Sequence, residues 1–239
     1  MRIVVNHLTR MTPGFICVAG ISVESNEHIR PICNRARLPL RWEATQGGVF
    51  GIGNVVDLGP VKYRGAPPEV EDREFREQRL RCLDRLPADA FWALLDEHHD
   101  TRLQRIFGPQ LRLAGNSCTT DRGTGKASLG VIVPDGITRL YAGKQGGVRL
   151  AFTVGRASLD LSVSDLRFYR MDDETASWAI DRNRLASVAY ALETGVPAIL
   201  SVGLTRPFRR DRDDNSRHWL QVNNIHLADD PLGDLEYEQ

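Results

Sequence analysis

Short apolar runs separated by turn signals follow one another along the first seventy residues. The runs at 2–6 and 15–21 flank Pro13-Gly14, which suits a turn because proline presets φ and glycine tolerates a positive φ. Further short runs follow at 29–33, 49–52 and 55–58. This spacing predicts about four or five short strands, the rhythm of a small β-barrel or sandwich.

The middle of the chain changes character after Pro67–Asp72. Residues 73–86 are charged and rich in helix formers, and Pro87 suits the first turn of a second helix. Within that second helix one face carries residues at helical spacing, namely Phe91, Leu94, Leu95 and His98. We therefore expect residues 73–108 to form a helical connector between two β units.

A second β region follows the connector. Residues 111–113 predict a short strand, the polar stretch 116–125 predicts a loop, and Asp135-Gly136 is a strong hairpin signal after the apolar run 129–133. Apolar and polar residues then alternate through 148–154 and 159–163. This alternation predicts an antiparallel meander with one face in solvent. A helix capped by Asp181 should follow over 181–194, before a final hairpin.

Two short sequences occur twice along this pattern. Leu8-Thr9-Arg10 and Leu204-Thr205-Arg206 each end the first predicted strand of a hairpin. Gln46-Gly47-Gly48-Val49 recurs as Gln145-Gly146-Gly147-Val148. Such internal similarity indicates two related β modules, in which Arg10 and Arg206 would occupy like positions.

These elements predict a mainly β chain with α insertions, an α+β fold of two tandem small β-barrels. Residues 1–72 should form the first barrel, 73–108 the helical connector, 109–228 the second barrel with its helix over 181–194, and 229–239 a frayed acidic tail. A meander, one helix and a last hairpin are the parts of a five-stranded oligonucleotide/oligosaccharide-binding (OB) barrel, although other small barrels share them.

Charge and cysteine usage narrow the class of protein. The 31 basic and 31 acidic residues give a formal net charge of zero, which argues against gripping nucleic acid through bulk charge but leaves room for a local basic groove. None of the four cysteines lies in a Cys-x-x-Cys pair, so a zinc ribbon is not expected. The first apolar run is too short for a signal peptide and no stretch is long enough to span a bilayer, so we expect a cytoplasmic protein with reduced thiols and no membrane partner.

The loop between the last two predicted strands carries the strongest functional signal. Arginines bind phosphates, and an exposed aromatic ring gives a base a surface on which to stack. The interleaved Asp211, Asp213 and Asp214 weaken its positive field, so a solvated, self-paired loop with Trp219 in the core is the alternative interpretation. The candidates here are Arg206, Phe208, Arg209, Arg210, Arg212 and Trp219, with Arg217 at the end of the loop.

Further candidates for nucleic-acid contact lie outside that loop. His7 and Arg10 stand in the first hairpin, Arg30 on the next strand, and Lys144 beside a Gly-Gly turn. The alternatives are that Arg10 and Arg206 pair with acidic neighbours to fix their hairpins, and that Lys144 is an ordinary surface lysine.

Other chemistries find little support. Gly123–Lys126 resembles a phosphate loop but lacks the required residues at Thr120 and Ala127. The acidic and histidine clusters Glu69–Asp72 and Asp96–Asp100 match no known metal-ligand spacing, and the chain has no Gly-x-Ser-x-Gly motif. We therefore expect no catalytic residue, no metal and no cofactor.

Several motifs resemble the dual OB domain family of prokaryotes. They are Asn6–Met11, Phe15–Ile21, His28–Pro31, Pro68–Asp72, Gly203–Pro207 and His218–Val222, and they span almost the whole chain. The resemblance implies two OB barrels in tandem and a role in nucleic-acid binding or modification, in bacterial conflict or defence. It carries no established catalytic residue.

The sequence thus predicts a non-catalytic nucleic-acid-binding protein that targets or senses nucleic acid beside an effector protein encoded elsewhere. Whether that nucleic acid is single- or double-stranded stays open. A scaffold for protein partners in a defence complex is the first alternative, and a metal-dependent enzyme that processes nucleic acid is the second.

Overall fold

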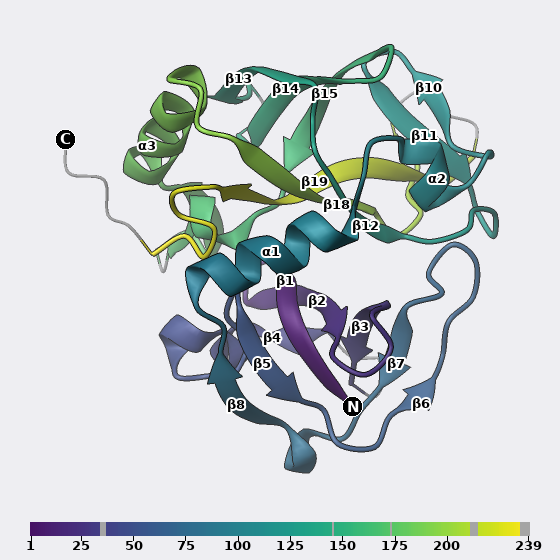
Figure 1. Ribbon diagram of the computed structural model, residues 1–239, viewed down its shortest axis with the longest axis vertical. Coiled ribbons are helices and arrows are strands. Elements are labelled where there is room, and N and C mark those ends of the chain that lie inside the picture. Colours follow the sequence, from purple (N-terminus) through teal and green to yellow (C-terminus); the bar gives the residue numbers. More distant parts are fainter. Residues whose placement is uncertain (34–36, 145, 173, 211–214, 235–239) are drawn as a thin grey trace.

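The strands of the computed structural model gather in two large sheets that lie one above the other (Figure 1). The structure describes residues 1–33, 37–144, 146–172, 174–210 and 215–234. The protein is mainly β, with three α-helices in the described residues. None of these helices is long and apolar enough to cross a membrane.

The first sheet is built from the N-terminal third of the chain. Its strands run in the order β6-β7-β3-β2-β1-β5-β8, with β4 paired to β2. Consecutive β1, β2 and β3 are antiparallel, β1 also pairs with β5, and β3 pairs with β7 in parallel. The bounds are β1 (Arg2–Arg10), β2 (Phe15–Ser22), β3 (His28–Ile32), β4 (Leu38–Pro39), β5 (Asn54–Asp57), β6 (Lys62–Tyr63), β7 (Asp72–Glu74) and β8 (Arg81–Arg85).

The helix predicted over residues 73–86 does not form. This segment contains the end of β7, one 3-10 turn over Glu77–Arg79, and the edge strand β8. Every residue of β8 is exposed, so the segment has no apolar stripe with which a helix could pack, and pairing with β5 decides its conformation. The connector's helical part is therefore limited to α1 (Ala88–His98), which follows Pro87 as expected, and α2 (Leu103–Phe107).

The second sheet has the order β13-β14-β15-β19-β18-β12-β9, and β11 joins it by pairing with β19. The predicted alternation is confirmed in β14, where buried and half-buried residues alternate without a break. The bounds are β9 (His99–Asp100), β10 (Arg112–Ala114), β11 (Ser117–Asp121), β12 (Leu129–Ile132), β13 (Gly136–Ala142), β14 (Val148–Val154), β15 (Ala157–Val163), β18 (Ala198–Leu204) and β19 (Arg217–Leu227). A small hairpin, β16 (Tyr169–Asp172) and β17 (Ser177–Ile180), stands apart.

Two further expectations about local structure have clear outcomes. Helix α3 (Arg182–Glu193) forms as predicted, and the Asp181 side chain accepts a hydrogen bond from the Arg184 backbone N–H. The stretch predicted as a loop at 116–125 instead contains β11, whose first four residues are buried. The sequence of β11 consists mainly of serine, cysteine and threonine, so it lacks the apolar pattern that predicts a strand. These small side chains can nevertheless be buried in a sheet.

The topology does not support equivalence of the two Leu-Thr-Arg hairpins. In the first sheet the meander β1-β2-β3 is followed by the parallel pair β3–β7, and in the second the meander β13-β14-β15 is followed by the parallel pair β15–β19. Hairpin β1–β2 therefore matches β13–β14, whereas β18–β19 is the last hairpin of its barrel. Arg10 and Arg206 accordingly end strands at different positions of the two barrels.

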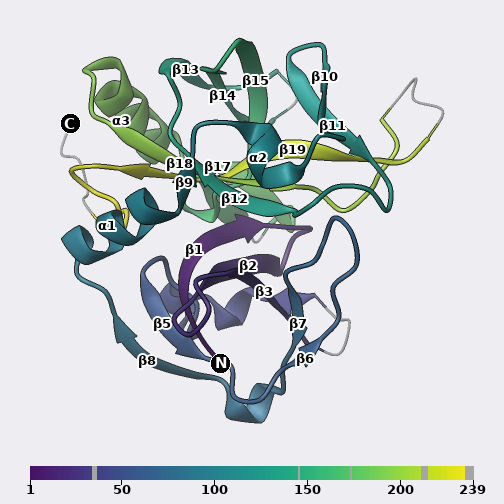
Figure 2. The ribbon, with the colours of Figure 1, turned by 45° about the vertical axis from the view of Figure 1, so that its right-hand side comes forward.

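Each sheet encloses its own hydrophobic cluster, and the two barrels also pack on each other. Val131, Leu166, Ile199 and Leu232 of the second half join the cluster of the first barrel, together with Phe91 and Leu95 of α1. The two views agree that α1 lies along the junction between the sheets (Figures 1 and 2). Asp230 and Leu232 are buried, so the expected frayed tail is packed against the protein at least through residue 232.

Candidate nucleic-acid interface

Two loops of the second barrel occupy the positions with which OB barrels bind their ligands. OB barrels use the loop between their first and second strands and the loop between their fourth and fifth. In the order β13, β14, β15, β18, β19, these are the turn at 143–147, which contains Lys144, and the arginine loop at 205–216. Lys144 is exposed and has no ion-pair partner within the described part of the chain.

The arginine loop begins as a regular continuation of hairpin β18–β19. The Phe208 backbone N–H donates to Arg217 at 3.0 Å and the Arg217 N–H donates back at 3.1 Å. Beyond this pair Arg209 and Arg210 are exposed, and the Phe208 ring is 44% exposed. Arg212 lies outside the described residues. The loop thus presents an aromatic side chain next to two cations.

Arg206 does not point freely into solvent, although its side chain is 53% exposed. Its guanidinium binds Asp72 at 2.8 Å and Glu69 at 3.2 Å, both carboxylates of the first barrel. Partial burial opposes its charge, but the hydrogen bond to Asp72 and the charges of both carboxylates raise the pKa of Arg206. The alternative interpretation, in which acidic residues bind this arginine, therefore holds for Arg206. These acidic residues are close in space but distant in the sequence.

Arg30 is buried in the same junction and offers no surface to a nucleic acid. It is 5% exposed, and its Nε donates to Asp72 at 2.5 Å while Nη1 donates to Ser128 at 3.2 Å. Glu71 accepts hydrogen bonds from the backbone N–H groups of Ser128 and Leu129 and from the Ser128 hydroxyl. Arg30, which was predicted to contact nucleic acid, instead joins the first barrel to Ser128 of the second.

His7 is likewise enclosed between the barrels, at 1% exposure. Its Nδ1 lies 3.0 Å from the Asn223 amide nitrogen, and its ring meets His28 edge to face at 5.3 Å. Burial, followed by the neighbouring charges of His28 and His226, holds the pKa of His7 well below its ordinary value. A neutral, covered imidazole cannot contact a phosphate from this position.

His226 shows how this polar interior is satisfied. Its Nδ1 donates to the Pro231 carbonyl at 3.1 Å, which leaves Nε2 to accept from the Ser201 hydroxyl at 3.0 Å, and Ser201 accepts from the Asn6 amide at 3.3 Å. Burial and then the charge of Arg167 lower the pKa of His226 to about 4. Burial also lowers the pKa of His28 to about 4.

Arg10 is half-buried and stacks on an aromatic ring of the other barrel. Its guanidinium carbon lies 4.1 Å from the centroid of Tyr169, whose hydroxyl in turn accepts from Val148 N–H at 2.9 Å. Val148 follows the Lys144 turn directly. Arg10 therefore supports this turn from the first barrel.

Trp219 is 5% exposed, and the Arg210 guanidinium covers its ring at 3.5 Å from the centroid. Of the ten predicted side chains, Lys144, Phe208, Arg209 and Arg210 are exposed, and so is Arg206, which is bound to Glu69 and Asp72. Sequence reasoning missed Glu69 and Asp72 as partners of Arg206, because nothing in the local pattern connects residues so far apart.

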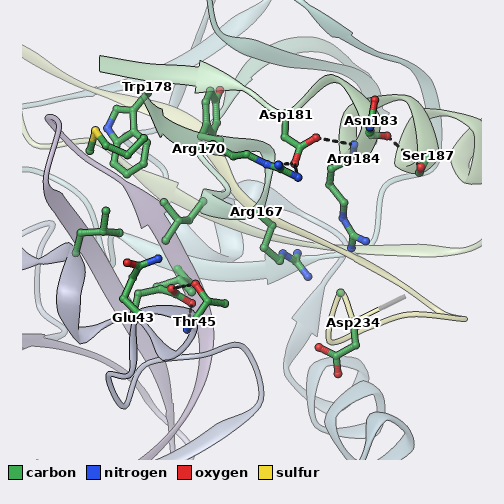
Figure 3. Close-up of a pocket in the computed structure, with 17 residues that line it drawn as sticks. Glu43, Thr45, Arg167, Arg170, Trp178, Asp181, Asn183, Arg184, Ser187 and Asp234 are labelled. Atoms are coloured by element: carbon green, nitrogen blue, oxygen red, sulfur yellow. Dashed lines mark hydrogen bonds and ion pairs between the residues drawn. The ribbon is translucent and has the colours of Figure 1, made fainter. Parts of the chain in front are cut away.

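A cleft of about 920 Å³ lies between the barrels, next to the start of α3. Figure 3 shows Arg167, Arg170 and Arg184 on one side of it and Trp178 on the other. Each arginine is engaged by a carboxylate: Arg167 by Asp165, Arg170 by Asp181 and Arg184 by Asp230. The cleft is therefore a charge-balanced surface and not a basic groove.

The acidic and histidine clusters are also engaged in local structure. The Nδ1 atoms of His98 and His99 donate to the carbonyls of Leu94 and Asp96. Among the described residues no group of three or more histidine, cysteine or acidic side chains is arranged to hold a metal ion.

Comparison with known proteins places the chain in a family. The model of the dual OB-containing domain matches residues 1–225, which is nearly the whole chain. The chain belongs to the dual OB-containing domain family. No curated protein and no solved structure matches it. Membership of this family fits the two barrels described above and indicates a fold of the nucleic-acid-binding type.

Proposed function

We propose that this dual OB protein binds nucleic acid through the second barrel, with the arginine loop and the Lys144 turn as its contact surface. The observation that carries the proposal is the side-by-side exposure of Phe208, Arg209 and Arg210 in the loop between the fourth and fifth strands. Arginines neutralise phosphates and the phenyl ring offers a stacking surface for a base. We infer a non-catalytic role, as the targeting or sensing subunit of a prokaryotic defence or nucleic-acid-modification system, beside an effector protein.

The contact surface in this proposal is smaller than the sequence indicated. His7, Arg30 and Arg206 serve the junction between the barrels, so binding does not depend on a continuous groove from Arg10 to Arg206. A protein with zero formal net charge can still make a small number of phosphate contacts, because its affinity for nucleic acid depends on the local density of positive charge.

Fluorescence anisotropy with labelled single- and double-stranded DNA and RNA at low salt tests the proposal directly. Replacing Phe208 and Arg209 together by alanine should weaken binding at least tenfold, since base stacking on an aromatic side chain alone is worth about 1–3 kcal/mol. Both residues are exposed, so the variant should keep its fold.

Arg156→Ala is the matched control. Arg156 is also exposed in the second barrel, but it lies in the turn between β14 and β15, at the opposite end of β14 from Lys144. Its removal should leave binding unchanged. Absence of binding to every nucleic acid, or equal losses in both variants, would contradict the proposed interface.

A scaffold for protein partners is the second candidate, and strand β8 favours it. All five of its residues are exposed, including Leu83 at 53%, and it lies at the edge of the first sheet. Exposed edge strands offer unpaired backbone groups to another chain. A partner that co-purifies with nuclease-treated protein and is lost on Leu83→Lys would support this function over the first.

A further inference from the structure

The connections that precede the last strand of each barrel meet at the junction. In the first barrel β5 pairs with β1 and β6 pairs with β7, so β5 and β6 together take the place of the fourth strand and β7 that of the fifth. The connection 64–71 therefore corresponds to the arginine loop of the second barrel. It rises towards the second barrel in both views (Figures 1 and 2). Equivalent loops of the two barrels thus face each other.

The acidic sequence Glu69–Asp72 ends this connection, and its members are unequally committed to the fold. Glu71 is 4% exposed and accepts hydrogen bonds at the start of β12, and Asp72 is 5% exposed and holds the buried Arg30. Glu69 instead contacts Arg206, whose side chain is 53% exposed, at 3.2 Å. Opening the Glu69 pair therefore leaves its arginine in contact with solvent and not as a buried, unpaired charge.

His218 is the other charged or titratable neighbour recorded for Glu69, and it does not replace Arg206. Its Nδ1 lies 3.7 Å from the Glu69 carboxylate but 2.9 Å from the Thr205 carbonyl oxygen. A carbonyl can only accept, so the Nδ1 proton points to Thr205. The charge of Glu69 is thus balanced by Arg206, and the charge of Arg206 by Glu69 together with Asp72.

The geometry of Arg206 allows one of these two carboxylates to be exchanged. Its Nη1 faces Glu69, while its Nη2 donates to Asp72 at 2.8 Å. A new acceptor can therefore replace Glu69 at Nη1 while the bond to Asp72 stays in place. Phosphate and carboxylate oxygens both match the donors of a guanidinium. Because Arg206 is exposed, a phosphate can reach it without separation of the barrels.

We propose that Glu69 is a built-in competitor of nucleic acid: it occupies the Arg206 guanidinium in the free protein, and a backbone phosphate bound at the arginine loop displaces it. The ligand then gains a phosphate contact two residues before Phe208, and the pair that opens is a partly exposed one of small net value. This inference rests on the proposed function and names its regulation. An acidic side chain of the first barrel lowers the affinity of the second.

Glu69→Gln tests the competition, because it removes the charge of the competitor and keeps its shape. By fluorescence anisotropy the variant should bind labelled nucleic acid about 2- to 5-fold more tightly than the wild type, the range expected for a partly exposed ion pair. The slope of log K against log salt should steepen by up to about 0.7 on a single strand, or about 0.9 on a duplex, for one added phosphate contact. Adding Arg206→Gln to this variant should abolish both gains.

Glu74→Gln is the matched control. It removes the same charge from the same barrel, but Glu74 pairs with Arg64 and not with Arg206. Glu69→Ala is a second test variant, since it has no side-chain acceptor left for Arg206, and it should gain at least as much affinity as Glu69→Gln. Urea unfolding of each variant shows that the comparison is made on folded protein.

The outcomes separate this inference from the proposed function. Binding by wild-type protein with no gain in either Glu69 variant, or with an equal gain in Glu74→Gln, would overturn the competition and leave the proposed function standing. Binding that appears only when Glu69 is replaced would support both. Absence of binding to any nucleic acid by the wild type and by both Glu69 variants would overturn both.

Discussion

Arg206 donates a hydrogen bond to Asp72 at 2.8 Å, and this contact joins the arginine loop of the second barrel to β7 of the first. Asp72 holds Arg30 through its other carboxylate oxygen, at 2.5 Å. One buried carboxylate therefore orders two guanidinium groups from different barrels. The position of the arginine loop depends on the first barrel, even though its proposed ligand contacts belong to the second.

Asp72→Asn should destabilise the protein by about 3–5 kcal/mol, because it leaves the buried Arg30 charge without its counter-ion. Arg206→Gln should cost less than about 1 kcal/mol, since the Arg206 side chain is 53% exposed and solvent screens the pair. Urea unfolding measures both free energies. Equal losses would mean that Arg30 is not held mainly by Asp72.

Glu71→Gln should lower the free energy of unfolding by about 1.5–3 kcal/mol, the value of hydrogen bonds to a charged group. Glu71 is 4% exposed and accepts from two backbone N–H groups and one hydroxyl at the start of β12. Glu74→Gln is the control, because Glu74 binds the partly exposed Arg64. If Glu71 variants also lose nucleic-acid binding, we attribute that loss to unfolding. A Glu71→Gln variant as stable as the wild type would contradict this structural role of Glu71.

The buried histidines should make stability fall as pH drops from about 6.5 towards 4. Folding lowers the pKa of His28 and His226 to about 4, so between these limits the unfolded chain binds more protons than the folded one. Stability is therefore complete above the unfolded pKa and is lost on acidification, by up to about 1.4 kcal/mol per pH unit for each histidine.

Urea unfolding at pH 7, 6 and 5 measures this slope, above the range in which most carboxylates titrate. His28→Asn should reduce the slope even if it also lowers stability at pH 7. A flat profile between pH 7 and 5 would contradict the neutral, buried state of these imidazoles.

The slope with which nucleic-acid affinity falls as salt is added should report the number of phosphate contacts. Each contact removed lowers the slope of log K against log salt by about 0.7 on a single strand. Arg209→Ala and Lys144→Ala should each reduce the slope by roughly this amount, and Arg156→Ala should not. An unchanged slope in the Arg209 variant would remove that side chain from the interface.

The sequence alone determined most of the local structure. The turn at Pro13-Gly14, the alternation in β14 and the Asp181 cap of α3 lie within a few residues of the elements they specify, and all three elements form. It also placed Lys144 and the arginine loop in the connections between strands, and the topology of the second barrel makes these the two loops through which OB barrels commonly bind ligands. Local pattern sufficed there because hydrogen bonding and burial repeat with the period of the element.

Only the tertiary structure decided which charges are free. Arg206 and Asp72 are 134 residues apart, and no periodicity relates them. The same holds for strand β8, whose pairing with β5 overrode its helix-forming composition, and for Trp219, which a loop arginine covers. The sequence lists the arginines and aromatic rings, but the packing of one barrel on the other determines which of them meet a carboxylate and which meet solvent.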